Sequence, residues 1–223
     1  MKDLTIIIPA KNEKESLPLV INSIDYLDCQ IVVSLKEDDL ETINSLKNKK
    51  IKFFYQSGGG YGNSLMEAIT SCKTKYFCIF NADGSFNPIE LKKMYLKINK
   101  NNFNIVFATR YEKNSGSEDD TMVTLLGNKI FSLIGNFFFS LPISDILYTY
   151  VLGETKKVQK IGLKRKDFTL CVELPIKAFK SGLNLTTSPS HERRRIAGKK
   201  KVNAIKDGYL ILQQMIKMFF NFD

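Results

Sequence analysis

The chain has 223 residues, of which 43% are hydrophobic and 25% are charged, and its formal net charge is +10. This length and apolar content predict one globular domain with an adequate core, and they exclude a disordered or low-complexity chain. The basic excess predicts an anionic partner. Composition alone leaves open whether that partner is nucleic acid, a phosphorylated small molecule or an anionic membrane surface. Part of the excess is local, because residues 191–201 hold six Lys or Arg and one Glu.

The cysteines and the apolar segments indicate the cellular compartment of the protein. Four cysteines show no metal-type spacing, which predicts free thiols in a reducing compartment. The amino terminus leads into a strand-like segment with no signal-peptide pattern, so we expect a cytoplasmic protein. The most apolar later stretch, Ile130–Ile143, is too short to span a bilayer, and both a buried core helix and an interfacial helix remain open.

Apolar, β-branched runs alternate with segments of helical period, which is the pattern of repeated βα units. We predict strands at Leu4–Ile8, Ile31–Ser34, Ile51–Tyr55, Tyr76–Phe80 and Ile105–Thr109. We predict helices at Ser16–Tyr26, Leu40–Leu46, Asn63–Ser71 and Pro88–Ile98. From Thr121 the chain changes to longer helical stretches, a strand-like Leu183–Thr187 and a final helix, Asn203–Phe220. The expected fold is α/β, with a mostly parallel central sheet flanked by helices.

A short polar loop, Asn81-Ala82-Asp83-Gly84, directly follows the apolar run Tyr76–Phe80. If that run is a buried parallel strand, the Asp83 carboxylate emerges at the edge of the sheet where open α/β sheets bind their ligands. A lone acid there can hold a divalent cation against phosphates. An ordinary turn is the alternative, since Asn, Asp and Gly are common turn residues.

Three other segments carry functional signals. Residues 9–13, Pro-Ala-Lys-Asn-Glu, offer amides and an acceptor at the end of the first strand, and they also suit a helix cap. Residues 58–64, Gly-Gly-Gly-Tyr-Gly-Asn-Ser, fit either an anion site before a helix or a flexible loop. The arginines of the basic run 192–201 suit phosphate, although on charge alone a polybasic membrane or nucleic-acid patch is the rival.

Taken in order, these segments resemble the motifs of family 2 glycosyltransferases of the GT-A fold, and most closely the dolichol-phosphate mannosyltransferase-like branch. Asn81-Ala82-Asp83 stands where that family has Asp-x-Asp, and Ala108-Thr109-Arg110-Tyr111 resembles its small-x-Arg-Tyr strand end. Residues 192–203 resemble its Glu-Arg-x-Arg-x-x-Gly-x-Ser-Lys-x-Asn segment, with Lys200 in place of Ser. The resemblance runs from Thr5 to about Gln214.

The resemblance implies a sugar-nucleotide site with Mg²⁺ or Mn²⁺. Asp83 would be the main ligand of the cation and a catalytic residue, and Asn81 a neutral second ligand. The implied donor contacts are Pro9, Ala10, Asn12, Glu13, Asp38, Gly60, Gly62, Asn81, Ala82, Arg110, Arg193, Arg195 and Lys201. Residues 1–115 would form the nucleotide-sugar-binding half of a single domain. Residues 116–223 would form the acceptor half, with the basic loop and the final helix.

Two departures from the family concern the acceptor. Residues 145–151 keep the acid of the family's Asp-x-x-Ser/Thr-Gly-Phe-Arg segment but lose its Gly and Arg. Polyprenyl-phosphate users carry a basic residue before the Gly-Asn of the next helix, where this chain has Leu125-Leu126 and then Lys129 after Gly127-Asn128. A lipid phosphate can attack through its own oxyanion. A hydroxyl acceptor needs a base, and the candidates are Asp145 first and Glu173 second.

The implied activity is transfer of a sugar, with inversion and a divalent cation, from a nucleoside diphosphate donor to a polyprenyl phosphate or a cell-surface glycan precursor. Peripheral contact with the inner face of the membrane is expected, and no specific nucleic acid is. Two alternatives stay open. A sugar-nucleotide binder without turnover is suggested by Asn81 and Val151, and a nucleic-acid-binding protein is suggested by the net charge alone.

A thermal-shift screen against nucleoside diphosphates and their sugars tests the donor site. We expect the melting temperature to rise with one base only, because a ligand that binds only the folded chain stabilises it. An unchanged melting temperature with every nucleotide would contradict a sugar-nucleotide site.

Overall fold

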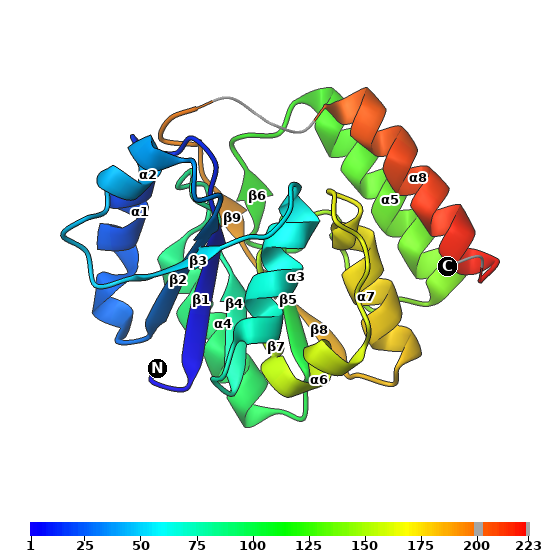
Figure 1. Ribbon diagram of the computed structural model, residues 1–223. Coiled ribbons are helices and arrows are strands. Elements are labelled where there is room, and N and C mark those ends of the chain that lie inside the picture. The colour runs from blue at the N-terminus through cyan, green and yellow to red at the C-terminus, as the bar shows by residue number, and fades with distance from the viewer. Residues whose placement is uncertain (199–202, 222–223) are drawn as a thin grey trace.

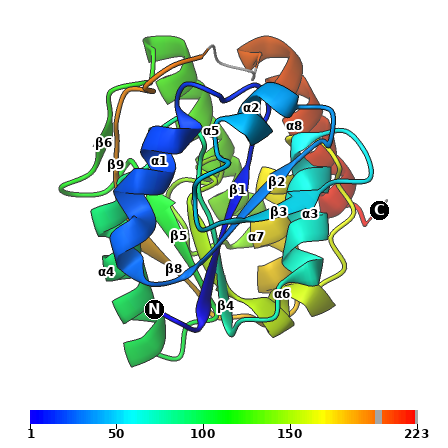
Figure 2. The ribbon, with the colours of Figure 1, turned by 60° about the vertical axis from the view of Figure 1, so that its left-hand side comes forward.

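A computed structural model describes residues 1–198 and 203–221 and shows a seven-stranded sheet between two layers of helices (Figures 1 and 2). The strand order is β3-β2-β1-β4-β7-β5-β8. The strands are β1 Leu4–Pro9, β2 Gln30–Leu35, β3 Lys52–Tyr55, β4 Tyr76–Ile79, β5 Ile105–Thr109, β7 Val151–Glu154 and β8 Leu185–Pro189. Neighbouring strands are parallel except at β7, which is antiparallel to β4 and β5. The predicted α/β fold with a mostly parallel sheet is confirmed.

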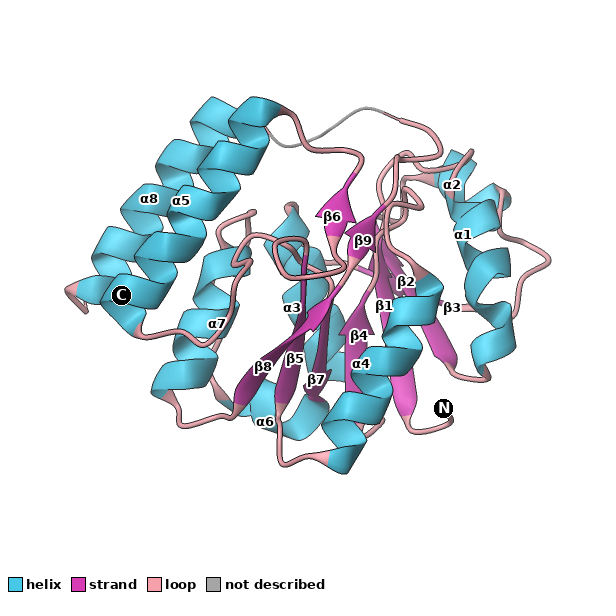
Figure 3. Cartoon of the chain, turned by 180° about the vertical axis from the view of Figure 1, so that it is seen from behind, coloured by secondary structure: helices cyan, strands magenta, loops and turns pink. Residues whose placement is uncertain are grey.

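The helices cover both faces of the sheet, as the edge view in Figure 2 shows. One face carries α1 Leu17–Ile24 and α4 Pro88–Lys100, and the other carries α3 Tyr61–Ser71, α6 Thr155–Lys160 and α7 Leu170–Lys180. The shorter helices η1 Asp25–Leu27 and α2 Leu40–Asn44 flank β2 in the chain, and the long helices α5 Met122–Phe139 and α8 Ala204–Phe219 lie side by side beyond α7 (Figure 3). Because side chains alternate along a strand, Ile6 and Ile8 enter one core and Ile7 enters the other.

Strand β7 is the strand of the main sheet that sequence periodicity did not predict. It is four residues long and contains Gly153, which weakens the sequence pattern of a strand. A Cβ at Gly153 would lie 3.0 Å from Cε1 of Phe77, so a glycine lets β7 pack against β4. The division of the domain at residue 115 stays a prediction. In the sheet the two parts interleave, because β7 lies between β4 and β5.

Four other elements refine the sequence expectations. The strand predicted at 183–187 is observed as β8, shifted toward the carboxyl end. A short parallel pair, β6 Gly116–Ser117 with β9 His191–Glu192, forms a second sheet. The buried core helix considered for the apolar stretch after Ile130 is wrong, because only Ser132, Gly135 and Phe139 of α5 are buried. Within the described residues, α5 is also the one helix long and apolar enough to cross a membrane by length and composition.

Phe77 lies at the centre of the sheet with no exposed surface, and it tests the packing of β7. We expect Phe77→Ala to lower the free energy of unfolding by about 3 to 5 kcal/mol, because it opens a cavity in a close-packed core. Urea denaturation measures this. As a control, Leu96→Ala on the exposed side of α4 should change the free energy of unfolding by no more than about 0.5 kcal/mol. Equal losses in the two variants would contradict this account.

Candidate functional site

The Asp83 loop follows β4 at the carboxyl edge of the sheet and is anchored by the buried Phe80 and Ala82. One oxygen of Asp83, Oδ1, accepts the backbone N–H of Ser85 at 3.0 Å. The amide of Asn81 donates to Oγ of Ser85 at 3.4 Å. The loop is thus a turn held by its own carboxylate, and the second oxygen, Oδ2, points elsewhere. The turn and the cation-site interpretations are compatible.

The basic run lies directly over this loop. The backbone N–H of Arg193 donates to the carbonyl of Ser85 at 2.9 Å, and that of Ile196 donates to the carbonyl of Asp83 at 2.7 Å. Nη2 of Arg193 donates to the carbonyl of Phe86 at 2.6 Å. These contacts hold residues 193–196 against the Asp83 loop, although about 110 positions separate the two in sequence. Lys201, also predicted to contact the donor, lies outside the described residues.

Arg195 faces the second oxygen of Asp83, Oδ2. Its Nη1 lies 3.6 Å from Oδ2 of Asp83, and its Nη2 donates to Oδ2 of Asp119 at 3.0 Å. Its Nε is buried and has no hydrogen-bond partner among the described residues. Since a buried N–H requires an acceptor, this atom fits an anionic ligand arriving beside Asp83.

A divalent cation fits at Asp83 only if a bound diphosphate or water supplies part of its coordination. Residues 1–198 and 203–221 contain no group of three or more His, Cys, Asp or Glu that could hold a metal. Asp83 would supply one carboxylate oxygen, Asn81 is near enough along the loop to add an amide oxygen, and diphosphate or water would supply the rest. The guanidinium of Arg195 is the positive charge that now faces this carboxylate.

Arg110, predicted to contact the donor, is buried in a cluster of carboxylates instead of facing solvent. Its Nε and Nη2 donate to Asp145 at 2.7 and 3.0 Å, and its Nη1 donates to Glu192 at 3.1 Å. Its guanidinium also lies 4.6 Å from the ring centre of Tyr148. Burial raises the pKa of Asp145 and of Glu192, and Arg110 opposes that rise in both. Contact between Arg110 and a donor phosphate would require this cluster to open.

The two acids considered as bases have no exposed surface. Asp145 accepts both the side chain and the backbone N–H of Arg110. Glu173 accepts the backbone N–H groups of Lys164 and Arg165 at 2.8 to 3.0 Å and pairs with Lys177 at 2.7 Å. In this conformation both carboxylates are occupied by structural partners, and neither faces solvent.

The end of β1 carries the other predicted donor contacts. The backbone N–H of Ala10, next to Pro9, donates to Ser34 on β2 at 2.9 Å. Asn12 has a positive φ of 53°, and its N–H donates to Asp39, the cap of α2. Glu13 is buried and accepts the hydroxyl of Ser16 at 2.8 Å. The N-cap of α1 is Ser16, and no side chain among the described residues caps this helix. Asp38 is exposed on the loop after β2, so it lies on the same sheet edge.

The glycine-rich loop is explained first by chain packing. A Cβ at either Gly60 or Gly62 would lie 2.2 Å from a backbone oxygen, that of Lys166 and of Arg165 respectively. Gly60 also has a φ of 107°, which disfavours other residues. The segment that approaches them is the one tied down by Glu173. Their glycine identity therefore has a structural reason, and their contact with the donor stays a prediction.

A surface cavity of about 470 Å³ opens beside Arg110, between β5, β6 and the first turns of α5. Lys129 lies over the ring of Tyr111 at 5.8 Å in its wall, and Met122 and Leu125 form an apolar side. Sequence reasoning named neither Tyr111 nor Met122 as a site residue. The available signals were Tyr111, as the last residue of the small-x-Arg-Tyr motif, and Lys129, a basic residue just after Gly127-Asn128. This cavity is the best candidate for an acceptor site.

Comparison with known proteins gives a family match and a set of solved structures with the same fold. The sequence model of glycosyl transferase family 2 matches residues 5–162. Uncharacterized glycosyltransferases of Mycobacterium tuberculosis and Mycobacterium bovis are each 22% identical over 209 residues, which is 93% of this chain and 93% of theirs.

Solved structures with the same fold include two sugar-phosphoglycerate synthases. A glucosyl-3-phosphoglycerate synthase from Mycobacterium tuberculosis, in complex with Mn²⁺, uridine diphosphate and glucosyl-3-phosphoglycerate, superposes with a TM-score of 0.75 at 12% identity. The match covers 97% of this chain and 79% of that one. A mannosyl-3-phosphoglycerate synthase from Rubrobacter xylanophilus gives 0.73 at 13% identity, covering 96% and 72%. At such identities the similarity shows the fold alone.

Asp145→Asn distinguishes a structural acid from a catalytic base. We expect it to lower the free energy of unfolding by about 3 kcal/mol, because it leaves the buried Arg110 with less compensating charge. Chemical denaturation measures this, and Glu41→Gln, which removes an exposed partner of Lys14, should leave stability unchanged. An Asp145→Asn protein of normal stability that has lost turnover would contradict the structural role.

Proposed function

We propose a donor and an acceptor for this chain on the premise that it belongs to glycosyl transferase family 2, as the match over most of its length shows. It is a glycosyltransferase, and we propose that it moves a hexose from a nucleoside diphosphate sugar with inversion. The donor diphosphate would lie between the Asp83 loop and residues 193–196, with Asp38 and residues 9–13 toward the base. The single observation that carries this placement is the basic segment laid over Asp83.

The phosphate contacts would come from the arginines of that segment. Arg195 already lies beside Asp83, and its Nε has no partner among the described residues. Arg193 stands two residues earlier on the same loop, where its guanidinium donates to the carbonyl of Phe86. Guanidinium groups bind phosphate in pairs of hydrogen bonds, which suits a leaving diphosphate whose charge increases during transfer. When bound at Asp83, Mg²⁺ or Mn²⁺ would add charge neutralisation at the same oxygens. A solved structure of the same fold in complex with Mn²⁺ and uridine diphosphate supports this choice.

The acceptor we propose is a phosphate with an apolar chain, of which a polyprenyl phosphate is the candidate. Asp145 and Glu173 are both fully buried and hydrogen-bonded, so neither can take a proton from an acceptor hydroxyl in this conformation. A phosphate oxyanion needs no base. Lys129 would face that phosphate in the cavity beside Arg110, and Met122 and Leu125 would contact the apolar chain. With this acceptor, we also propose that the chain belongs to the dolichol-phosphate mannosyltransferase-like branch of the family.

Two other acceptors follow from specific observations. A glycan precursor is the alternative if a hydroxyl attacks. The acids lining the cavity, Glu112 and Asp120, would then be the ones to consider as its base. A small phosphorylated acid is suggested by the phosphoglycerate bound in a structural neighbour. Release of nucleoside diphosphate in the presence of a short polyprenyl phosphate, a glycan precursor or phosphoglycerate distinguishes the three.

Asp83→Ala tests the donor site. We expect turnover with Mn²⁺ and the donor to fall about 100-fold or more, because the variant loses the carboxylate that neutralises charge at the leaving group. Asn81→Asp should strengthen cation binding, because it adds a charged oxygen ligand. We expect it to lower the Mn²⁺ concentration needed for half-maximal donor binding. Donor binding is measured by the rise in melting temperature, and turnover by nucleoside diphosphate release.

Asp25→Ala removes an exposed acid next to α1 and serves as the control, with turnover expected at the level of the unsubstituted protein. Full turnover in Asp83→Ala would rule out its role as cation ligand. Donor binding with no turnover for any acceptor would favour a sugar-nucleotide-binding protein without activity.

A further inference from the structure

The outer sides of α5 and α8 form one exposed apolar face. On α5, Leu126, Leu133 and Phe137 point outward, and on α8 so do Ile205, Tyr209 and Ile216. Phe137 is 81% exposed and Ile205 is 85% exposed. The residues on each helix recur at intervals of four or seven positions, which places them on one side of the helix. We refer to these six residues as the outer apolar face.

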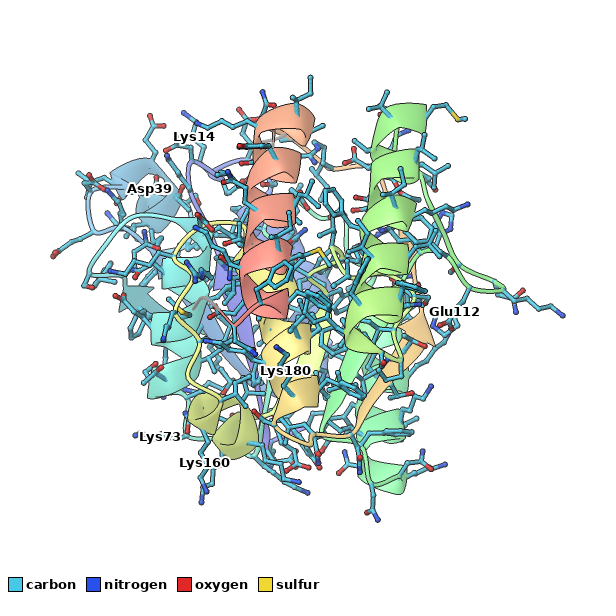
Figure 4. The ribbon with its side chains drawn as sticks, turned by 90° about the vertical axis from the view of Figure 1, so that its right-hand side faces the viewer. Lys14, Asp39, Lys73, Glu112, Lys160 and Lys180 are labelled. Atoms are coloured by element: carbon cyan, nitrogen blue, oxygen red, sulfur yellow. The ribbon has the colours of Figure 1, made fainter. Side chains whose placement is uncertain are left out.

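The two stripes belong to a single surface because the helices pack against each other. The ring centres of Phe138 and Phe219 lie 5.3 Å apart. Figure 4 shows α5 and α8 side by side at the front of the molecule, with Lys180 labelled below α8. Their opposite sides are already used, since Phe139 of α5 and Ile211, Met215 and Met218 of α8 are buried in the domain core. A helix that is apolar on both sides requires a second apolar environment, and so large an exposed apolar surface marks an interaction site.

The charges on these helices indicate what that environment is. α5 carries one charged residue, Lys129, and α8 carries Lys206 and Lys217 against the single acid Asp207. A carboxylate oxygen of Asp207 accepts the backbone N–H of Asn203 at 2.6 Å, so this acid caps its own helix. Lys180 adds a further cation at the carboxyl end of α8, where its Nζ donates to the carbonyl of Met218. The outer apolar face therefore has a basic border.

We propose that the outer apolar face docks on an anionic lipid bilayer, with α5 and α8 lying in the plane of the interface. Apolar side chains would enter the boundary of the acyl chains while the lysines meet the anionic headgroups. A second copy of the chain fits less well, because a twofold contact would bring the same lysines together with few acids to compensate them. Spanning by α5 is disfavoured, because its buried residues tie one side of the helix to the domain.

The cavity beside Arg110 opens at the edge of this face. Met122 and Leu125, which line it, belong to the first turns of α5, and Lys129 lies one turn further along. A lipid phosphate could then enter the cavity while its chain stays in the bilayer. This use of the docked state rests on the proposed function, whereas docking itself depends on no sugar transfer.

Vesicle flotation without any nucleotide tests the docking surface. We expect the full chain to float with mixed phosphatidylcholine and phosphatidylglycerol vesicles, and to bind phosphatidylcholine alone more weakly. The double variant Leu133→Glu with Phe137→Glu should lower the bound fraction about tenfold or more, because it removes two apolar contacts and adds two negative charges. The control Ile89→Glu with Leu96→Glu makes the same change at exposed positions of α4 and should float normally. Circular dichroism confirms that both variants are folded.

Three outcomes would overturn the proposal. These are failure to float with the mixed vesicles, an equal loss in the two double variants, and a stable dimer in light scattering that Leu133→Glu with Phe137→Glu dissociates. Asp83→Ala should float like the unsubstituted chain. Loss of turnover with retained flotation would therefore leave docking intact, and a failure of the sugar-transfer proposal is distinguishable from a failure of docking.

Discussion

A guanidinium group taken out of water must be matched by carboxylates at hydrogen-bond distance, and Arg110 meets this requirement with groups from distant parts of the chain. Asp145 precedes β7, and Glu192 lies on β9. Arg110 stands directly after β5, so one buried cluster joins the end of this strand to two segments that come later in the chain. Because Glu192 is fixed there, Arg193 and the residues after it start at the carboxyl edge of the sheet.

The same edge explains why contacts that stabilise the fold also shape the candidate site. Residues 193–196 are held over the Asp83 loop by backbone hydrogen bonds, and the guanidinium of Arg195 forms an ion pair with the Asp83 carboxylate. A ligand that carries both a cation and phosphates would replace this ion pair with two others. The cation would bind Asp83, and the phosphates would accept hydrogen bonds from Arg195.

Helices α5 and α8 differ from the other helices in how much of their apolar surface is buried. Helices α1, α3 and α4 each bury one side against the sheet, as amphipathic helices in such folds do, and α7 is buried along most of its length. Helices α5 and α8 bury one side and keep a second apolar side exposed. This second side contributes nothing to the core that the structure describes, and the candidate acceptor cavity lies beside the first turns of α5.

The sequence by itself determined the alternation of strands and helices, the position of Asp83 after a buried strand and the basic run at 192–201, because periodicity and local turn chemistry are properties of short segments. Tertiary structure decided what no short segment contains. It placed the four-residue β7 between β4 and β5, turned Arg110 toward Asp145 and Glu192, and gave Gly60 and Gly62 a packing role against residues 165 and 166. These outcomes depend on contacts between residues tens of positions apart, whose energies appear only when the chain is folded.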